Sequence, residues 1–333
     1  MAALRFFWFP LSLWAIALIG VFLWGGFGPL VIAAILTILE VTLSFDNAVV
    51  NARVLERMTP EWQKRFITWG IPIAVFGTRF LLPIIIVAVA VGAAPFAIAK
   101  LALFEPAAYG ELLHGVHALI AAFGGMFLLM VGLKYFFDSA KEVHWIAAIE
   151  RTLARFGRIE AIEIGIALAA LFGIAWFVQD HAEQVLFAGI IGILLFILMQ
   201  GIARSFEGAV GKGAVQGGFA LFMYLELLDA AFSLDGVIGA FAITSALPVI
   251  VAGLGVGAFF VRSLTIYLVR EKTLDELVYL EHGAHWAILG LAGAMLASIF
   301  VEIPEIVTGC IGIVFVAAAY WSSLQARKAA VRV

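Results

Sequence analysis

The chain has little charge, few histidines and one cysteine. Cys310 has no second cysteine to pair with, which excludes a disulfide within the chain and leaves the redox compartment undefined. Charged residues make up 13% of the 333 residues, against roughly a quarter in a soluble domain. Hydrophobic residues make up 64%, and the mean hydropathy is +1.11. The composition therefore indicates a protein embedded in a lipid bilayer.

Further absences narrow the functional class. The sequence contains no GxxxxGK[ST] phosphate-binding loop, so we do not expect this chain alone to pump with ATP. A net charge of −3, carried mostly in expected loops, does not indicate a nucleic-acid partner. The apolar stretch from Phe6 to Phe27 lacks the small-x-small pattern of a cleaved secretory signal, which predicts a retained first helix. No catalytic residue or cofactor is predicted, and an enzyme is not expected.

Long apolar runs predict transmembrane helices. The runs at 11–23, 84–91 and 190–199 lie inside stretches near the roughly 20 residues that a helix needs to cross about 30 Å of hydrocarbon. They are apolar all round, whereas a membrane β-strand alternates polar and apolar residues, so the predicted fold class is all-α. We expect ten spans, at 6–24, 28–52, 66–91, 114–137, 160–178, 183–203, 216–243, 246–270, 282–301 and 305–324.

The distribution of cations orients these spans. Of the 20 Lys and Arg residues, Lys100 falls on one side and Arg79 and Arg262 fall inside spans, which leaves 17 on the side of both termini. Because cytoplasmic loops carry the excess of Lys and Arg, both termini are predicted to be cytoplasmic, in a cell inner (cytoplasmic) membrane. The segment 138–159 mixes charges with apolar residues at helical spacing, which predicts an elbow along the cytoplasmic membrane surface.

A short pattern occurs twice. EVTLSFDN at 40–47 and DAAFSLDG at 229–236 carry an acid, a serine and an aspartate at identical offsets, and HGVH at 114–117 is matched by HGAH at 282–285. Arg79 and Arg262 lie between the two elements of each pair. Because the second and seventh expected spans cross in opposite directions, we predict an inverted repeat of three-helix units, as in many transporters. The alternative is chance matching in a biased composition. The predicted parts are a first helix (1–27), the first unit (28–137), the elbow with two helices (138–213), the second unit (214–301) and a last helix with a cytoplasmic tail (302–333).

Acids within the expected spans are the candidate functional residues. Each ionisable residue near the bilayer centre costs roughly 2.5 to 3.5 kcal/mol, so these acids need arginines, histidines, cations, protons or water as partners. Carboxylate, amide and hydroxyl oxygens favour a hard divalent cation such as manganese, magnesium or calcium. The predicted metal-handling residues are Glu40, Asp46, Asn47, Glu226, Asp229 and Asp235, supported by Ser44, Ser233, Arg79 and Arg262.

Two structural expectations follow for these acids. On ideal helices Asp46 and Asp235 lie about 120° from the first acid of their motifs, so a common site requires helix breaks near 46–47 and 235–236. Asn47 and Gly236 suit such breaks. The alternative is that the acids only pair with Arg79 and Arg262 and lock helices together. That alternative applies most to Glu226, which has no counterpart in the first unit.

The histidine pairs are predicted to begin their spans at the two membrane surfaces. His114 with His117, and His282 with His285, have the i, i+3 spacing of neighbours on one helix face, which is workable for a metal. Gating or proton entry, direct metal ligation and plain polar packing remain open for these residues. Small-residue patterns such as Gly253-Leu-Gly255-Val-Gly257 allow close packing within the chain or in a homo-oligomer.

With the SFDN and SLDG segments, the chain resembles the TerC family of integral membrane proteins, over roughly 28–137 and 214–301. That family is associated with tellurium resistance and manganese export. The resemblance implies that Glu40, Asp46, Asp229 and Asp235, with Asn47, handle the metal. The expected function is a secondary transporter that exports a divalent cation, manganese by resemblance, in exchange for protons. The alternatives are a non-transporting membrane scaffold in metal or tellurite stress and a membrane-embedded metalloenzyme.

Overall fold

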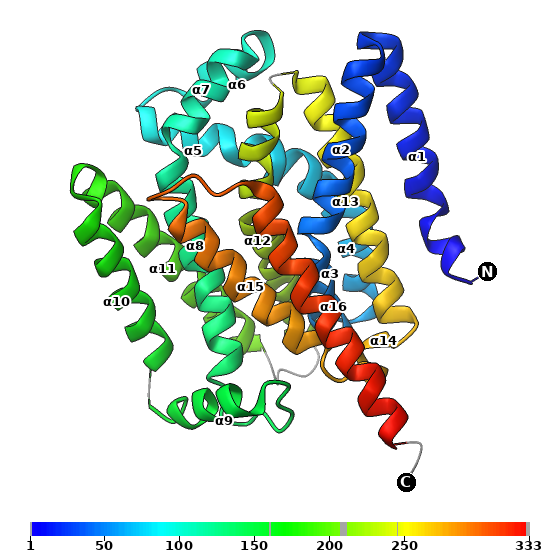
Figure 1. Cartoon of the computed structure of the whole chain (residues 1–333), viewed down its shortest axis with the longest axis vertical. Helices are drawn as coiled ribbons and strands as arrows, with labels where there is room; N and C mark the ends of the chain where they lie inside the picture. Colours follow the sequence, from blue (N-terminus) through cyan, green and yellow to red (C-terminus); the bar gives the residue numbers. More distant parts are fainter. Residues whose placement is uncertain (1, 160, 207–211, 245, 331–333) are drawn as a thin grey trace.

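The computed structural model describes residues 2–159, 161–206, 212–244 and 246–330, and every regular element in these ranges is a helix (Figure 1). The all-α prediction is therefore confirmed. The first half contains α1 (Ala2–Gly25), α2 (Phe27–Leu43), α3 (Phe45–Glu56), α4 (Pro60–Pro72), the π-helix η1 (Ile73–Leu81), α5 (Leu82–Val91), α6 (Pro95–Phe104), α7 (Pro106–Gly115) and α8 (His117–Phe136). The second half contains α9 (Ala147–Phe156), α10 (Ile162–Phe177), the 3₁₀ turn η2 (Gln179–His181), α11 (Ala182–Phe206), α12 (Lys212–Ile243), α13 (Leu247–Arg270), α14 (Thr273–Glu276), α15 (Leu280–Ala297) and α16 (Glu305–Ala330).

Several of these helices are fit to cross a membrane. Within the described residues, five helical stretches are long and apolar enough, at Phe6–Gly25, Pro60–Val91, His117–Phe136, Ala182–Gly201 and Leu247–Arg270. The bent pair of α2 and α3 makes a sixth if it is one span. The other four expected ranges coincide with α10, α12, α15 and α16, which do not meet that standard in the described part of the chain. α10 has only 16 residues, and α12 contains Glu226, Asp229 and Asp235.

Helix breaks occur at one of the two predicted places. α2 ends at Leu43 and α3 begins at Phe45 with a bend of 50°, so the chain breaks at Ser44, two residues before Asp46. α12 continues without a break through 235–236, so the second predicted break is wrong. An ideal Cβ at Gly236 would lie 3.5 Å from Oε2 of Glu40, an ordinary contact distance, so this part of α12 faces the first acid of the other motif.

The ends of the molecule differ from the expected loops. Residues between the third and fourth expected spans form the helices α6 and α7, which lie at the opposite end of the molecule from α9 (Figure 1). α7 ends at Gly115 and α8 begins at His117, so the HGVH segment spans a helix junction. The expectation that His114 and His117 share one helix face is therefore wrong. HGAH lies inside α15, as expected.

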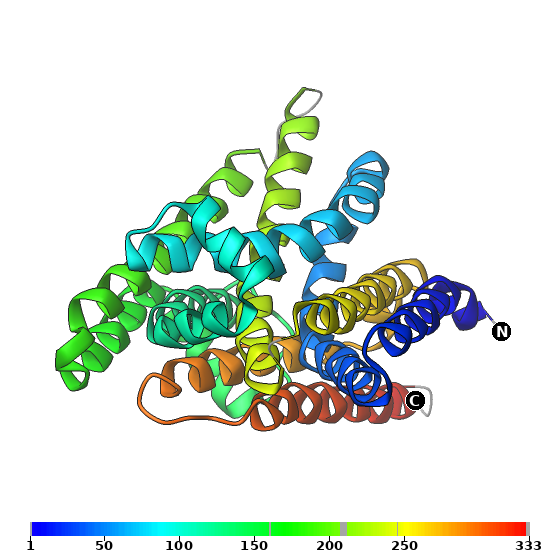
Figure 2. The same ribbon diagram turned by 90° about the horizontal axis from the view of Figure 1, so that it is seen from above.

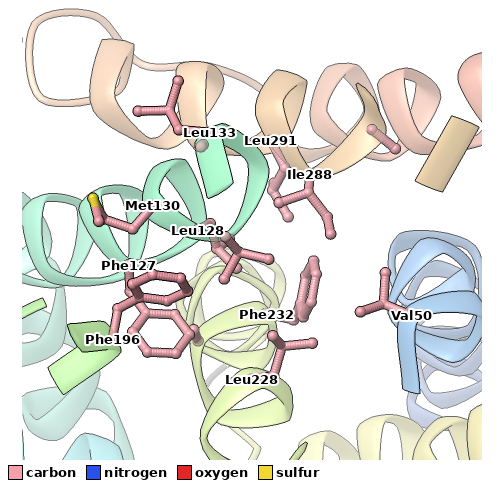
Figure 3. Close-up of a cluster of buried hydrophobic side chains, with 14 of the residues drawn as sticks. Val50, Phe127, Leu128, Met130, Leu133, Phe196, Leu228, Phe232, Ile288 and Leu291 are labelled. Atoms are coloured by element: carbon pink, nitrogen blue, oxygen red, sulfur yellow. The ribbon is translucent and has the colours of Figure 1, made fainter. Parts of the chain in front are cut away.

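Apolar side chains pack the helices against one another. α8 packs against α11 and α15, and α13 packs against α1 and α2. Seen from above, α2 lies between α13 and α16 (Figure 2). The largest core cluster joins α3, α8, α11, α12 and α15 through side chains such as Val50, Phe127, Phe196, Phe232 and Ile288 (Figure 3).

The small-residue pattern of α13 serves packing within the chain. An ideal Cβ at Gly253 would lie 2.6 Å from Cβ of Leu36, and one at Gly257 would lie 2.5 Å from Cβ of Glu40. Both glycines therefore let α13 and α2 approach closely. This contact places α13 directly beside the first acid of the EVTLSFDN motif.

Candidate functional site

A buried guanidinium joins acids of the two repeated motifs. Arg79 forms an ion pair with Glu40, and its Nη1 lies 3.5 Å from Oδ2 of Asp229. Ser44 donates a hydrogen bond from Oγ to Oε1 of Glu40 (3.0 Å), and Asn47 donates from Nδ2 to Oδ1 of Asp229 (2.9 Å). All five side chains are buried. The structure thus brings together the centres of both motifs, which are 182 residues apart at the Asn47–Asp229 hydrogen bond.

The π-helix η1 positions Arg79. This nine-residue segment lies between α4 and α5, and Nη1 of Arg79 donates a 2.7 Å hydrogen bond to the carbonyl of Ala74. π-helical segments are rare and occur often at functional sites. The local backbone therefore directs the arginine toward Glu40 and Asp229, and we call this buried group of charged and polar side chains the polar core.

A second ion pair lies nearby on α12 and α13. Nη2 of Arg262 lies 3.5 Å from Oε1 of Glu226, and the guanidinium is 3.7 Å from the ring centroid of Phe66. An ideal Cβ at Gly70 would lie 2.5 Å from Oε1 of Glu226, so the absence of a side chain at Gly70 lets α4 pack closely against this pair. The pairing fits the alternative interpretation of Glu226 as a partner of arginine.

The last two predicted acids are placed differently. Asp46 is 1% exposed, and its Oδ1 accepts the backbone N–H of Asn47 (2.9 Å). An ideal Cβ at Gly312 would lie 4.0 Å from Oδ2 of Asp46, so this carboxylate faces α16, and it has no arginine partner among the described residues. The side chain of Asp235 lies outside the described part of the structure. Ser233 is buried and donates from Oγ to the carbonyl of Asp229 (2.6 Å).

The polar core has oxygen acceptors to spare. Two buried oxygens, Oε1 of Glu226 and Oδ2 of Asp229, face arginine nitrogens at 3.5 Å without a hydrogen bond. Three more have no hydrogen-bond donor among the described residues: Oδ1 of Asn47, Oδ1 of Asn51 and Oε2 of Glu226. Nε of Arg79 and Nη1 of Arg262 are donors without an acceptor. Buried polar atoms are normally satisfied, so the excess of acceptors points to protons, water or a cation. In the described part of the chain, however, no three acidic, histidine or cysteine side chains converge closely enough to hold a metal ion.

The histidines serve as packing and hydrogen-bonding groups at the two ends. His114 is exposed, and Nε2 of His117 lies 3.4 Å from Oγ of Ser298. His285 stacks on Tyr135 with ring centroids 3.6 Å apart, and its Nδ1 lies 2.8 Å from the carbonyl of Glu281. None of these contacts links a histidine to the acids around Arg79.

His282 belongs to a hydrogen-bonded contact between α9 and α15, formed by Glu150, His282 and Trp286 and called the latch below. Oε2 of Glu150 lies 2.8 Å from Nδ1 of His282, and Oε1 accepts Nε1–H of Trp286 (3.0 Å). The backbone N–H groups of Trp145 and Ile146 donate to the same carboxylate (3.2 Å each). Burial by itself raises the pKa of Glu150, but these donors outweigh burial and hold its pKa well below the ordinary value. The elbow is therefore fastened to the start of α15.

Two cavities lie on either side of the acids. A polar cavity of about 400 Å³ is lined by Arg53, Tyr135, Tyr224 and His285, with Val50 one turn along α3 from Asn47. A cavity of about 20 Å³ touches Arg79 on the other side, between Tyr109 and Phe241, whose rings form an edge contact at 5.3 Å. A water needs about 10–15 Å³, so the smaller cavity has room for one.

Sequence reasoning missed three residues of this arrangement. Asn51 follows Asn47 by one helical turn, and that spacing could have revealed it. Glu150 lies in the segment that we predicted to be an elbow, and its contacts with α15 are tertiary. Tyr109 lies in the unpredicted α7, so no local signal marked it.

The structure defines an all-helical protein that has several helices fit to cross a membrane and a charged cluster buried among them. The chain belongs to the DUF475 family, described as a protein of unknown function, whose family model matches residues 45–330. The match includes Asn47, Arg79, Asp229 and Arg262 and begins after Glu40. A search of curated proteins and one of solved structures each found no significant match.

Proposed function

We propose that this chain is a secondary transporter that exports a divalent metal cation in exchange for protons. The observation that carries the proposal is the charge of the buried core. The described core contains four buried acids, Glu40, Asp46, Glu226 and Asp229, but only two buried arginines, Arg79 and Arg262. If all six groups are ionised, two negative charges remain without a counter-charge. The resemblance to the TerC family supports manganese as the transported substrate.

One divalent cation or two protons would neutralise the remaining charge. Metal binding keeps carboxylates deprotonated, whereas closely spaced buried acids take up protons once the metal leaves. Export of a divalent cation against 100 mV, inside negative, costs roughly 4.6 kcal/mol at about 2.3 kcal/mol per charge. Exchange of one cation for two protons moves no net charge, so the pH gradient alone would drive it.

The ion pair of Arg79 suggests how the site is regulated within a transport cycle. Its guanidinium occupies the space between Glu40 and Asp229, where it supplies the positive charge. A metal ion that binds both acids would have to displace the arginine. We infer that Arg79 acts as a tethered counter-ion, which holds the acids together when the substrate is absent.

The proposal includes the topology. Ten spans with cytoplasmic termini, in a cell inner membrane, place the 400 Å³ cavity at the cytoplasmic surface. The small cavity at Arg79 then faces the outside. An inverted repeat is supported by the meeting of Asn47 and Asp229, which occupy the two motif helices. The structure then represents a state that is wider toward the cytoplasm.

The test is a flux measurement in tight liposomes. Manganese movement and internal pH are recorded together under an imposed proton gradient, with magnesium and calcium in parallel. We compare wild type, Asp46→Asn and the control Glu61→Gln, because Asp46 is buried without an arginine partner in the described structure and Glu61 is exposed.

Coupled manganese and proton movement that is lost in Asp46→Asn but retained in Glu61→Gln would support the proposal. Absence of flux for all three ions in correctly loaded vesicles would refute it and favour a scaffold. A scaffold would depend instead on the 138–159 segment that Glu150 fastens to α15.

A further inference from the structure

A groove runs along the surface between α13 and α16. It has a volume of about 570 Å³, and apart from Thr42 its lining is apolar or aromatic. Leu268, Leu277, Leu280 and Val316 are buried at its base, whereas Ile313 and Tyr320 are partly exposed at its edge. The groove is separate from the polar core, since neither Arg79 nor Arg262 lines it.

Two exposed cations, Arg270 and Lys272, follow the lining residue Leu268 by two and four residues, where α13 ends. They do not line the groove themselves, and the exposed Glu271 lies between them in the sequence. Among the described side chains no carboxylate pairs with either of them, whereas Arg327 nearby is already paired with Glu276 (2.7 Å). The guanidinium of Arg270 instead lies 5.9 Å from the ring centroid of Phe6.

The groove with its neighbouring cations therefore matches an amphiphilic ligand that has one apolar chain and one anionic end. Its apolar length would accept a hydrocarbon chain, and its charged end would accept an anionic group. Tyr267 and Tyr320 line it, and tyrosines are enriched where membrane proteins meet the headgroup region. Basic residues at the end of an intramembrane groove are a recognised feature of sites for anionic lipids.

We propose that this groove binds an anionic phospholipid, with an acyl chain along α13 and α16 and the phosphate on Arg270 and Lys272. The bound chain would also touch Val41, Thr42 and Phe45, which line the groove on both sides of the break at Ser44. The lipid would thereby brace the bend between α2 and α3. This site requires only that the protein is embedded in a membrane, so it stands or falls independently of metal transport.

The test measures lipid retained by the purified full-length protein. Protein in a neutral detergent is titrated with phosphatidylglycerol or phosphatidylcholine, and bound lipid is counted by native mass spectrometry while thermal unfolding is followed. We expect one retained phosphatidylglycerol and a raised melting temperature, with much weaker retention of phosphatidylcholine. Since each cation near a membrane surface contributes about 1 kcal/mol, Arg270→Gln with Lys272→Gln should weaken retention roughly thirtyfold.

Matched variants separate this site from general lipid adhesion. Ala317→Trp should fill the groove and prevent retention, whereas Ala318→Trp alters the adjacent exposed position that does not line it. Arg151→Gln with Arg155→Gln removes two exposed cations from α9 and should leave retention unchanged.

Two results would overturn the proposal. Equal retention of both lipids by all variants would show that lipid binds the whole apolar surface. A change in oligomeric state on Ala317→Trp, without a change in retained lipid, would show that a second copy of the chain covers the groove.

Discussion

Replacement of Arg79 by glutamine tests the central ion-pair network. The substitution leaves Glu40 and Asp229 buried without their shared cation, although Ser44 and Asn47 still donate hydrogen bonds to them. Loss of one partner from a buried pair costs about 3–5 kcal/mol. At roughly 2 °C per kcal/mol for a long chain, the melting temperature should fall by about 6–10 °C.

The assay is thermal unfolding in detergent with and without manganese. If Arg79 is a tethered counter-ion, a divalent cation should restore Arg79→Gln more than it stabilises wild type, by about 2.7 kcal/mol at a hundred times its Kd. Adding Glu40→Gln to Arg79→Gln should recover part of the lost stability, because it removes one of the two uncompensated charges. Arg151→Gln, at an exposed position, is the control. A variant as stable as wild type, with no response to any divalent cation, would refute this reasoning.

Two further expectations concern the latch and the second ion pair. Because the pKa of Glu150 is lowered in the folded protein, its ionised form contributes stability above its ordinary pKa of 4.5, and that contribution is lost as the pH falls toward the folded value. The melting-temperature difference between wild type and Glu150→Gln, equivalent to about 3 kcal/mol at pH 7, should therefore shrink below pH 4.5; a difference independent of pH would contradict the role of the charge. Gly70→Ala should destabilise the protein by about 1–3 kcal/mol, since its Cβ would crowd Glu226 and Arg262. The control Gly20→Ala meets open space and should be neutral or stabilising in the same melting assay.

The helical content of the chain was predictable because long runs that are apolar on all sides fit membrane helices and do not fit the alternating strands of a membrane barrel. Charge distribution and residue spacing also marked Arg79, Glu40 and Asp229, which meet in the structure, whereas the side chain of Asp235 lies outside its described part. The break at Ser44 was expected within two residues, but α12 has no break at 235–236. The two motifs share the spacing of their acids and serines, so this spacing does not distinguish a broken helix from a continuous one.

Other parts of the site depend on contacts that no local pattern contains. Arg79 pairs with acids from both motifs because the π-helix, α2 and α12 meet in space. The latch at Glu150 joins residues 132 and 136 positions apart in the sequence. α6 and α7 were missed because two ten-residue helices are too short to resemble membrane spans.

The π-helix makes the location of a positive charge depend on how the backbone winds. Within Ile73–Leu81 the backbone accommodates more residues per turn than an α-helix does. If the same residues wound as an α-helix, five steps of about 100° would place Arg79 roughly 140° around the axis from Ala74, whereas the i to i+5 pattern of a π-helix keeps the two close in direction. The guanidinium would then leave Glu40 and Asp229 although every charged residue is still present. In this segment the helical winding therefore decides where the positive charge lies.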